Sequence, residues 1–179
     1  TFYTQHTEEF YDFYKNKMIF LDAKPNKAHL KLAEMERAGK LSAIVTQNID
    51  GLHQAAGSKN VFELHGSVHR NYCQKCGKFF DVNYVVNAKG VPYCDECGGI
   101  IKPDVVLYEE GLDSQTINGA VRAISKADML IIGGTSLVVY PAAGMIDYFK
   151  GKYLAVLNRD ATSRDKQADL CITDPIGEV

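Results

Sequence analysis

The sequence of 179 residues predicts an α/β fold, in which a Rossmann-like parallel sheet has helices on both faces and a small four-cysteine insert interrupts the chain. Three observations lead there. Short apolar runs alternate with helical patterns, which implies crossover connections between parallel strands. Cysteines cluster within residues 70–102, outside this alternation. A hydrophobic content of 46% with 23% charged residues is enough for one good core.

The first elements are helical. A helix is expected over residues 8–17, and a second from an N-cap at Asn26 to Glu36. In the second helix, apolar residues recur at helical spacing and Gly39 supplies a stop. A further helix is expected over residues 114–125, where Ile117, Val121 and Ile124 share one face.

Six apolar runs read as strands, because each is short and bounded by turn residues or helical patterns. Most alternate with helices, as in doubly wound sheets. The expected strands are residues 41–46, 61–64, 105–108, 129–132, 153–157 and 170–172.

Both ends of the chain suggest that it is part of a longer protein. The first residue is threonine, and the following residues run directly into the first helical pattern. Near the other end, Pro175 precedes residues that resemble a helix N-terminus, where proline is favoured.

Cys73 and Cys76 form one Cys-x2-Cys pair, and Cys94 and Cys97 form another after seventeen intervening residues. This spacing is typical of a tetrahedral four-thiolate zinc site. Two disulfides or a redox pair are the alternatives, but the chain shows no secretory signal. Four thiolates complete the coordination shell, so we expect one structural zinc ion. The remaining Cys171 is expected to be a buried apolar residue.

A zinc ribbon can also bind nucleic acid, so a binding module without catalysis is an alternative function. The net charge of −2 and a pI near 6.2 argue against it. Residues 70–102 hold five basic and three acidic side chains, a slight excess. No apolar run reaches the length of a membrane span and no signal peptide is recognisable, so a cytoplasmic protein is expected.

The most polar strand end in the chain is residues 46–53, Thr-Gln-Asn-Ile-Asp-Gly-Leu-His, which follows an apolar strand. Ligands of open parallel sheets bind beyond the carboxyl ends of their strands. His65 and Gly66 end the next apolar run. These two strand ends therefore predict a site with amide, carboxylate and imidazole groups.

Two later strand ends extend this pattern. Residues 133–136, Gly-Gly-Thr-Ser, suit a phosphate or ribose contact, although glycines after a strand are often only a tight turn. Asn158 and Arg159 follow the next strand. Four polar strand ends together predict a dinucleotide.

Taken in order, these motifs resemble the sirtuin family, NAD-dependent protein-lysine deacylases. The resemblance is carried by TQNIDGLH at 46–53, His65-Gly66, the four cysteines, residues 103–110, residues 134–137 and Asn158. It implies a bacterial NAD-dependent protein deacetylase that converts acetyl-lysine to lysine and releases nicotinamide and O-acetyl-ADP-ribose. NAD-dependent ADP-ribosyl transfer to protein is the nearest alternative.

The resemblance also implies roles for single residues. His65 would be the general base, since an imidazole can accept a ribose hydroxyl proton at neutral pH. His53 is expected to be a structural residue or to support residues that contact the cofactor, and His69 is expected to be solvated. The implied NAD contacts are Gln47, Asn48, Ile49, Asp50, His65, Gly134, Thr135, Ser136, Asn158, Arg159 and Asp174.

An acetylated protein or peptide would bind as an added strand, between an edge at residues 105–108 and the segment after residue 136. The implied contacts are Val105, Val106, Leu107, Tyr108, Val138, Val139 and Tyr140. Relatives that prefer acidic acyl groups carry a Tyr-x-x-Arg pair where this chain has Tyr11 and Tyr14. A carboxylate would lack its guanidinium partner, so a neutral acyl group is expected.

The chain departs from the family in two respects. The glycine-rich first strand, turn and helix that hold the pyrophosphate are missing, so we expect this chain alone to be inactive. Glu109 stands where glycine is usual.

The predicted organisation is a Rossmann-like NAD-binding domain of residues 1–69 and 103–179, and a zinc-binding module of residues 70–102.

Overall fold

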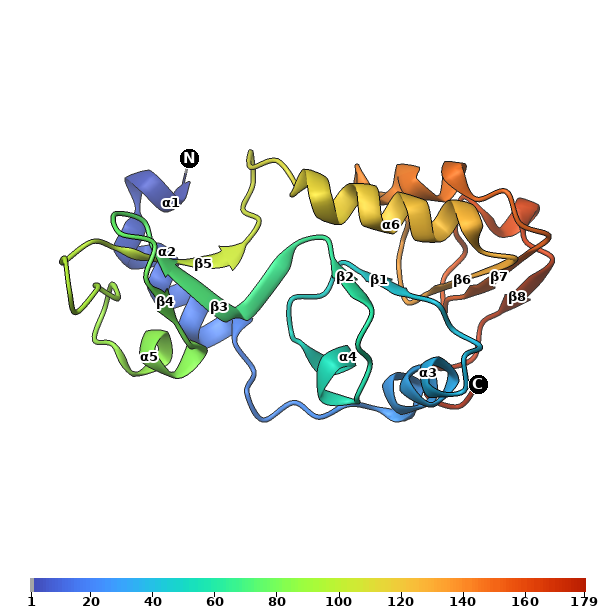
Figure 1. Cartoon of the computed structure of the whole chain (residues 1–179), viewed down its shortest axis with the longest axis horizontal. Coiled ribbons are helices and arrows are strands. Elements are labelled where there is room, and N and C mark those ends of the chain that lie inside the picture. Colours follow the sequence, from blue (N-terminus) through green and yellow to red (C-terminus); the bar gives the residue numbers. More distant parts are fainter. Residues whose placement is uncertain (1) are drawn as a thin grey trace. The chain divides into compact units, whose positions relative to one another are not determined.

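A computed structural model describes residues 2–179, which divide into two compact units (Figure 1). Unit 1 comprises residues up to Ala23, Asn48–Gly51 and His65–Leu112. Unit 2 comprises Lys24–Gln47, Leu52–Leu64 and Asp113–Val179. The predicted division into an NAD-binding domain and a zinc-binding module concerns function rather than compactness and stays a prediction.

Unit 1 consists of helices packed on an antiparallel sheet. Its helices are α1 (Phe2–Gln5), α2 (Thr7–Phe13), which continues into a π-helical turn η1 (Tyr14–Met18), and α5 (Val82–Asn87). Its strands are β3 (Gly66–Cys73), β4 (Phe79–Phe80) and β5 (Ile101–Val105), in the order β4-β3-β5.

An aromatic cluster holds α2 and η1 to this sheet. Phe10, Tyr11 and Tyr14 are buried, with ring centroids 5.2 to 6.4 Å apart. The Tyr11 hydroxyl donates to the backbone oxygen of Ile101 in β5. Burial raises the pKa of both tyrosine hydroxyls, so they stay protonated.

Unit 2 contains the parallel strands. β1 (Ile44–Thr46) pairs with β2 (Val61–Glu63), and β6 (Met129–Gly133), β7 (Tyr153–Leu157) and β8 (Leu170–Ile172) form a second parallel sheet. Its helices are α3 (Lys27–Arg37), α4 (Leu52–Ala55), α6 (Ser114–Lys126) and the 3-10 segments η2 (Ala142–Tyr148) and η3 (Asp165–Gln167). Figure 1 shows α6 and α3 on opposite sides of β6–β8.

Local sequence explains where the helices of unit 2 begin. The Asn26 side chain accepts from the His29 backbone N–H at 3.1 Å, and His29 Nδ1 lies 3.3 Å from the Asn26 backbone nitrogen, so the two form a capping box. Asp113 caps α6 through the Thr116 backbone N–H at 2.7 Å. The sheet core of this unit is Ile132, Leu137, Leu154 and Val156.

Most expected elements are present, and the α/β fold class with its four-cysteine cluster is confirmed. The strand expected at 105–108 is wrong: β5 ends at Val105 and runs antiparallel to β3. Residues 41–43 do not belong to β1, and Pro175 precedes a turn rather than a helix. Cys171 is exposed in β8, not buried.

Among the described residues, no helix has both the length and the apolar character needed to cross a membrane.

Candidate active site

Residues 46–53 begin at the end of β1 and end in the short helix α4, as the sequence predicts. Thr46 is buried, and its backbone oxygen accepts from the Leu64 N–H at 2.9 Å. Gln47, Ile49 and Asp50 are half-buried, whereas Asn48 is exposed. The loop therefore presents polar side chains while its two ends are fixed by β1 and α4.

Within unit 1, β3 fixes the middle of this loop. The Val68 N–H donates to the Ile49 backbone oxygen at 3.0 Å, and His69 Nε2 lies 3.0 Å from the Asp50 backbone oxygen. Gly51 has a φ of 69°. A Cβ atom there would lie 2.8 Å from His69 Cδ2, so the close approach requires glycine. His69 is exposed, as expected, but it contacts the predicted site.

His65 lies directly before β3 and is half-buried. Its backbone oxygen accepts from the Val106 N–H at 3.0 Å. Gly66 has a φ of 76°, and a Cβ atom there would lie 1.9 Å from the Asp104 backbone oxygen. Only glycine permits β3 to approach β5 at this point, so the backbone of the predicted general base lies against the end of β5.

The second predicted group of cofactor residues lies in unit 2, where β6 and β7 end. Parallel pairing places Gly133 opposite Leu157, and the Gly134 N–H donates to the Leu157 backbone oxygen at 3.0 Å. The Leu137 N–H donates to the Thr135 hydroxyl at 3.3 Å, and Ser136 is exposed. A Cβ atom on Gly133 would lie 2.7 Å from Ile176 Cδ1.

Asn158 follows β7 at the same edge of this sheet. Its backbone N–H donates to the Ile172 oxygen at 3.0 Å and its side-chain amide to the Asp160 oxygen at 2.8 Å. Arg159 is the next residue in the chain, and Asp174 comes shortly after β8; both are exposed. The ends of β6, β7 and β8 thus bring together the residues that the sequence assigned to phosphate and adenosine.

The residues predicted to contact peptide do not form strands beyond Val105. The Leu107 N–H donates to Glu110 Oε2 at 2.9 Å, and Tyr108 is 98% exposed. In unit 2, Val138, Val139 and Tyr140 are also exposed, at 71%, 49% and 73%. These side chains are therefore accessible to a partner in the described structure.

The four cysteines of the predicted metal site come together in unit 1. All four Sγ atoms lie within 4.8 Å of one another, with Cys73 to Cys97 at 3.4 Å and Cys76 to Cys94 at 3.7 Å. A tetrahedral zinc ion with Zn–S bonds of about 2.3 Å separates its sulfurs by about 3.8 Å. The residues present therefore fit a four-thiolate zinc ion.

The charges around these sulfurs also suit a cation. Desolvation raises the pKa of Cys73, but hydrogen bonds from the backbone N–H groups of Cys76 and Lys75 and with the Cys97 and Cys76 sulfurs together outweigh it and bring the pKa to about 6. The Lys78 backbone N–H lowers the pKa of Cys76, yet the Cys97 sulfur and burial raise it to about 12. Neighbouring thiolates repel one another, and a divalent cation removes that repulsion.

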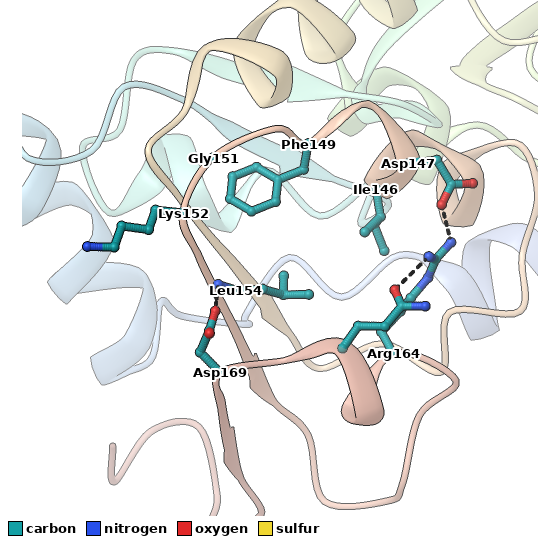
Figure 2. Close-up of a pocket in the computed structure, with 9 residues that line it drawn as sticks. Ile146, Asp147, Phe149, Gly151, Lys152, Leu154, Arg164 and Asp169 are labelled. Carbon is teal, nitrogen blue, oxygen red and sulfur yellow. Dashed lines mark hydrogen bonds and ion pairs between the residues drawn. The ribbon is translucent and has the colours of Figure 1, made fainter.

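The cavity in Figure 2 is a different feature of unit 2, with a volume of about 420 Å³. Its polar side chains bond to one another: Arg164 pairs with Asp147 at 2.6 Å and donates to Gln167 at 3.1 Å. Asp169 accepts from the Leu154 N–H at 2.8 Å. Its lining includes none of the predicted site residues among those the structure describes.

Comparisons with known proteins all point to one family. Residues 1–141 match the family model described as "Sir2 family". Two relatives, from Clostridium acetobutylicum and Clostridium perfringens, are each named NAD-dependent protein deacetylase. They are 66% and 63% identical to this chain over its whole length. The chain covers 74% of each relative, so both are longer than it.

Solved structures match as well. One described as "Sir2-p53 peptide-NAD+" has a TM-score of 0.92 at 41% identity, over 99% of this chain and 76% of that chain. Another, "Sir2 bound to acetylated peptide", has a TM-score of 0.91 at 41% identity, over 99% and 77%. The chain spans about three quarters of the length of these proteins.

Proposed function

The chain belongs to the Sir2 family, and we propose from this premise that it removes acetyl groups from protein lysines with NAD as co-substrate. The observation that carries this proposal is the family match over residues 1–141, which includes the 46–53 loop, His65 and all four cysteines. The family, the NAD dependence and the deacetylase function predicted from the sequence are confirmed by the relatives.

We propose that His65 is the general base of the reaction. NAD supplies the nicotinamide leaving group and the ADP-ribose acceptor of the acetyl group. An imidazole can hold a ribose hydroxyl proton at neutral pH. The contacts of the His65 backbone with Val106 and of Gly66 with Asp104 support this role, because they limit where the imidazole can lie.

NAD contacts are proposed for both groups of strand-end residues. In the first loop, Gln47, Asn48, Ile49 and Asp50 would hold the nicotinamide and its ribose. In the second group, Gly134, Thr135 and Ser136 would meet phosphate or ribose. The backbone N–H groups and hydroxyls after β6 suit that contact. Asn158, Arg159 and Asp174 complete the proposed adenosine contacts.

The substrate is proposed to be an acetylated protein segment that binds in extended form by main-chain hydrogen bonds. Solved relatives include one bound to an acetylated peptide, which supports this class of partner. The exposure of Tyr108, Val138 and Tyr140 suits such contacts. We place the protein in the cytoplasm, as its sequence suggests.

A neutral acyl group is the proposed preference. Tyr11 and Tyr14 are both fully buried in the aromatic cluster of unit 1, and neither offers a positive charge to a carboxylate. Hydrolysis of succinyl-lysine at the rate of acetyl-lysine would contradict this preference.

We further propose that residues 1–179 alone are inactive. The resemblance assigns pyrophosphate binding to a glycine-rich turn that these residues do not contain, and the relatives are about a third longer than this chain. Deacetylation of an acetyl-lysine peptide by the 179-residue chain would overturn this proposal. The full-length protein is expected to deacetylate the same peptide.

The test of the proposed function uses the full-length protein with His65→Ala, and His6→Ala as the control on an exposed histidine of unit 1. We expect His65→Ala to abolish NAD-dependent deacetylation while zinc content and melting temperature stay unchanged. The control should keep full activity. Label from NAD that accumulates on protein instead of on O-acetyl-ADP-ribose would favour ADP-ribosyl transfer.

The non-catalytic alternative makes an opposite prediction. A zinc-ribbon binding module would show salt-dependent binding to a polyanion and no effect of NAD on the melting temperature. A deacetylase should be stabilised by NAD.

A further inference from the structure

His69 is a surface residue of β3 that donates a hydrogen bond to the proposed cofactor loop. Its Nε2 atom lies 3.0 Å from the Asp50 backbone oxygen. A carbonyl oxygen can only accept, so the proton of the imidazole must be on Nε2. The side chain is exposed, so it contributes little to the core of unit 1.

The ring of His69 also occupies the space beside Gly51. A Cβ atom on Gly51 would lie 2.8 Å from Cδ2 and 3.0 Å from Nε2 of His69. Next to it, the Val68 N–H donates to the Ile49 oxygen at 3.0 Å. Two consecutive residues of β3 therefore hold two consecutive carbonyl groups of the loop, one through its backbone and the other through its side chain.

We propose that His69 is a positioning residue for NAD binding, which acts by fixing the Asn48–Gly51 loop. A peptide unit is planar, so holding the Asp50 oxygen sets the orientation of the whole Asp50–Gly51 peptide. That leaves Asp50 fewer backbone conformations before the cofactor arrives. This inference rests on the proposed role of Asn48 and Asp50 as NAD contacts.

Loss of His69 should weaken NAD binding without affecting the chemical step. A loop that must be ordered by the ligand binds it less tightly than one already ordered. The hydrogen bond is solvent-exposed, so we expect a modest effect of about five-fold in the dissociation constant of NAD. The binding of acetylated peptide in the absence of NAD should be unchanged.

The experiment compares His69→Ala and His69→Gln in the full-length protein, with His6→Ala as the control. Glutamine can present an amide N–H near the position of Nε2 and should restore most of the affinity. NAD binding is measured by calorimetry, and the KM for NAD and kcat by steady-state kinetics. We expect His69→Ala to raise both NAD constants about five-fold, with kcat changed less than two-fold.

Several results would overturn the proposal. Unchanged NAD affinity in His69→Ala would do so, as would no recovery in His69→Gln. A fall in kcat and melting temperature without a change in NAD affinity would indicate a purely structural role and reject it. Failure of the proposed function is recognised separately, because the unmutated full-length protein would then show no NAD-dependent deacetylation.

Discussion

Replacement of Glu109 by glycine should stabilise the protein, although it removes a charged side chain. Glu109 has a φ of 75° and lies at the third position of a turn in which the Glu110 N–H donates to the Leu107 oxygen at 3.0 Å. Positive φ at this position is the mark of a type II turn, which favours glycine. The chain forms the turn with glutamate in the left-handed region instead.

The magnitude follows from two opposing terms. A non-glycine residue in the left-handed region costs about 1–2 kcal/mol, and glycine relieves that strain. Glycine also has more freedom in the unfolded chain, which costs about 0.5–1 kcal/mol. The side chain of Glu109 is exposed, so little packing is lost. We expect a net gain of about 0.5–1 kcal/mol and a melting temperature higher by about 2 °C.

Leu137 provides the matched control, because it is the other non-glycine residue with positive φ among those described, at 57°. Unlike Glu109, it is buried, at 8% exposure in the core of unit 2. Leu137→Gly relieves similar strain but removes a buried leucine side chain, a change that costs about 2–5 kcal/mol. The two substitutions should therefore act in opposite directions.

Thermal denaturation followed by circular dichroism, with zinc present throughout, measures both variants. A melting temperature of Glu109→Gly at or below that of the wild type would refute the reasoning. It would mean that the glutamate side chain stabilises the turn by more than the backbone strain. A rise in Leu137→Gly would likewise show that burial had been overvalued.

Three further predictions concern other parts of the fold. Cys94→Ser or a strong chelator should unfold unit 1 with loss of one zinc ion per chain, whereas Cys171→Ser should not; equal zinc content in all would refute this. Asp113→Ala should lower stability at pH 7, because the Thr116 N–H lowers the pKa of Asp113 and stabilises its carboxylate. The difference should shrink below pH 3.8 as the pH falls through the lowered pKa of Asp113; a difference that does not change with pH would contradict it. Gly119→Ala should destabilise by about 1–2 kcal/mol despite the higher helix propensity of alanine, since its Cβ would lie 2.3 Å from Phe62 Cε1; stabilisation in urea melts would exclude the clash.

The direction of the Asp113 effect follows from the sign of the shift. A carboxyl whose pKa is lowered by folding stabilises the native state above its unfolded pKa and loses that contribution as the pH falls through the folded value. The hydrogen bonds to Thr116 exist only in the folded helix α6.

Features that depend on neighbouring residues were predictable from the sequence. The Asn26 cap of α3 follows from a side chain beside its own helix, and the two Cys-x2-Cys pairs depend on turns of a few residues. The strand ends that carry Asn48 and Asn158 could be found because an apolar run stops at a polar one. The four-cysteine cluster and the family were predicted in this way.

Pairing between distant strands was not predictable. Residues 105–108 look like a strand of a parallel sheet, yet β5 ends at Val105 and pairs antiparallel with β3. An apolar run does not specify its partner, because partner choice depends on contacts across the whole sheet. The exposure of Cys171 on β8 was also missed, because burial of a strand residue depends on contacts across the whole sheet.

The contact of His69 with Asp50 shows what only the tertiary structure decided. The sequence places His69 four residues after His65 and gives no sign that it reaches Asp50, nineteen residues earlier. The register of β3 on β5 shifts between Ser67 and Asn71, and this irregularity helps to set which side chains of β3 face which neighbours. The sequence by itself predicted which residues carry the chemistry, because residue type and local spacing can be read along the chain. The fold determined which residues hold them in place, because that depends on distances between segments far apart in the chain.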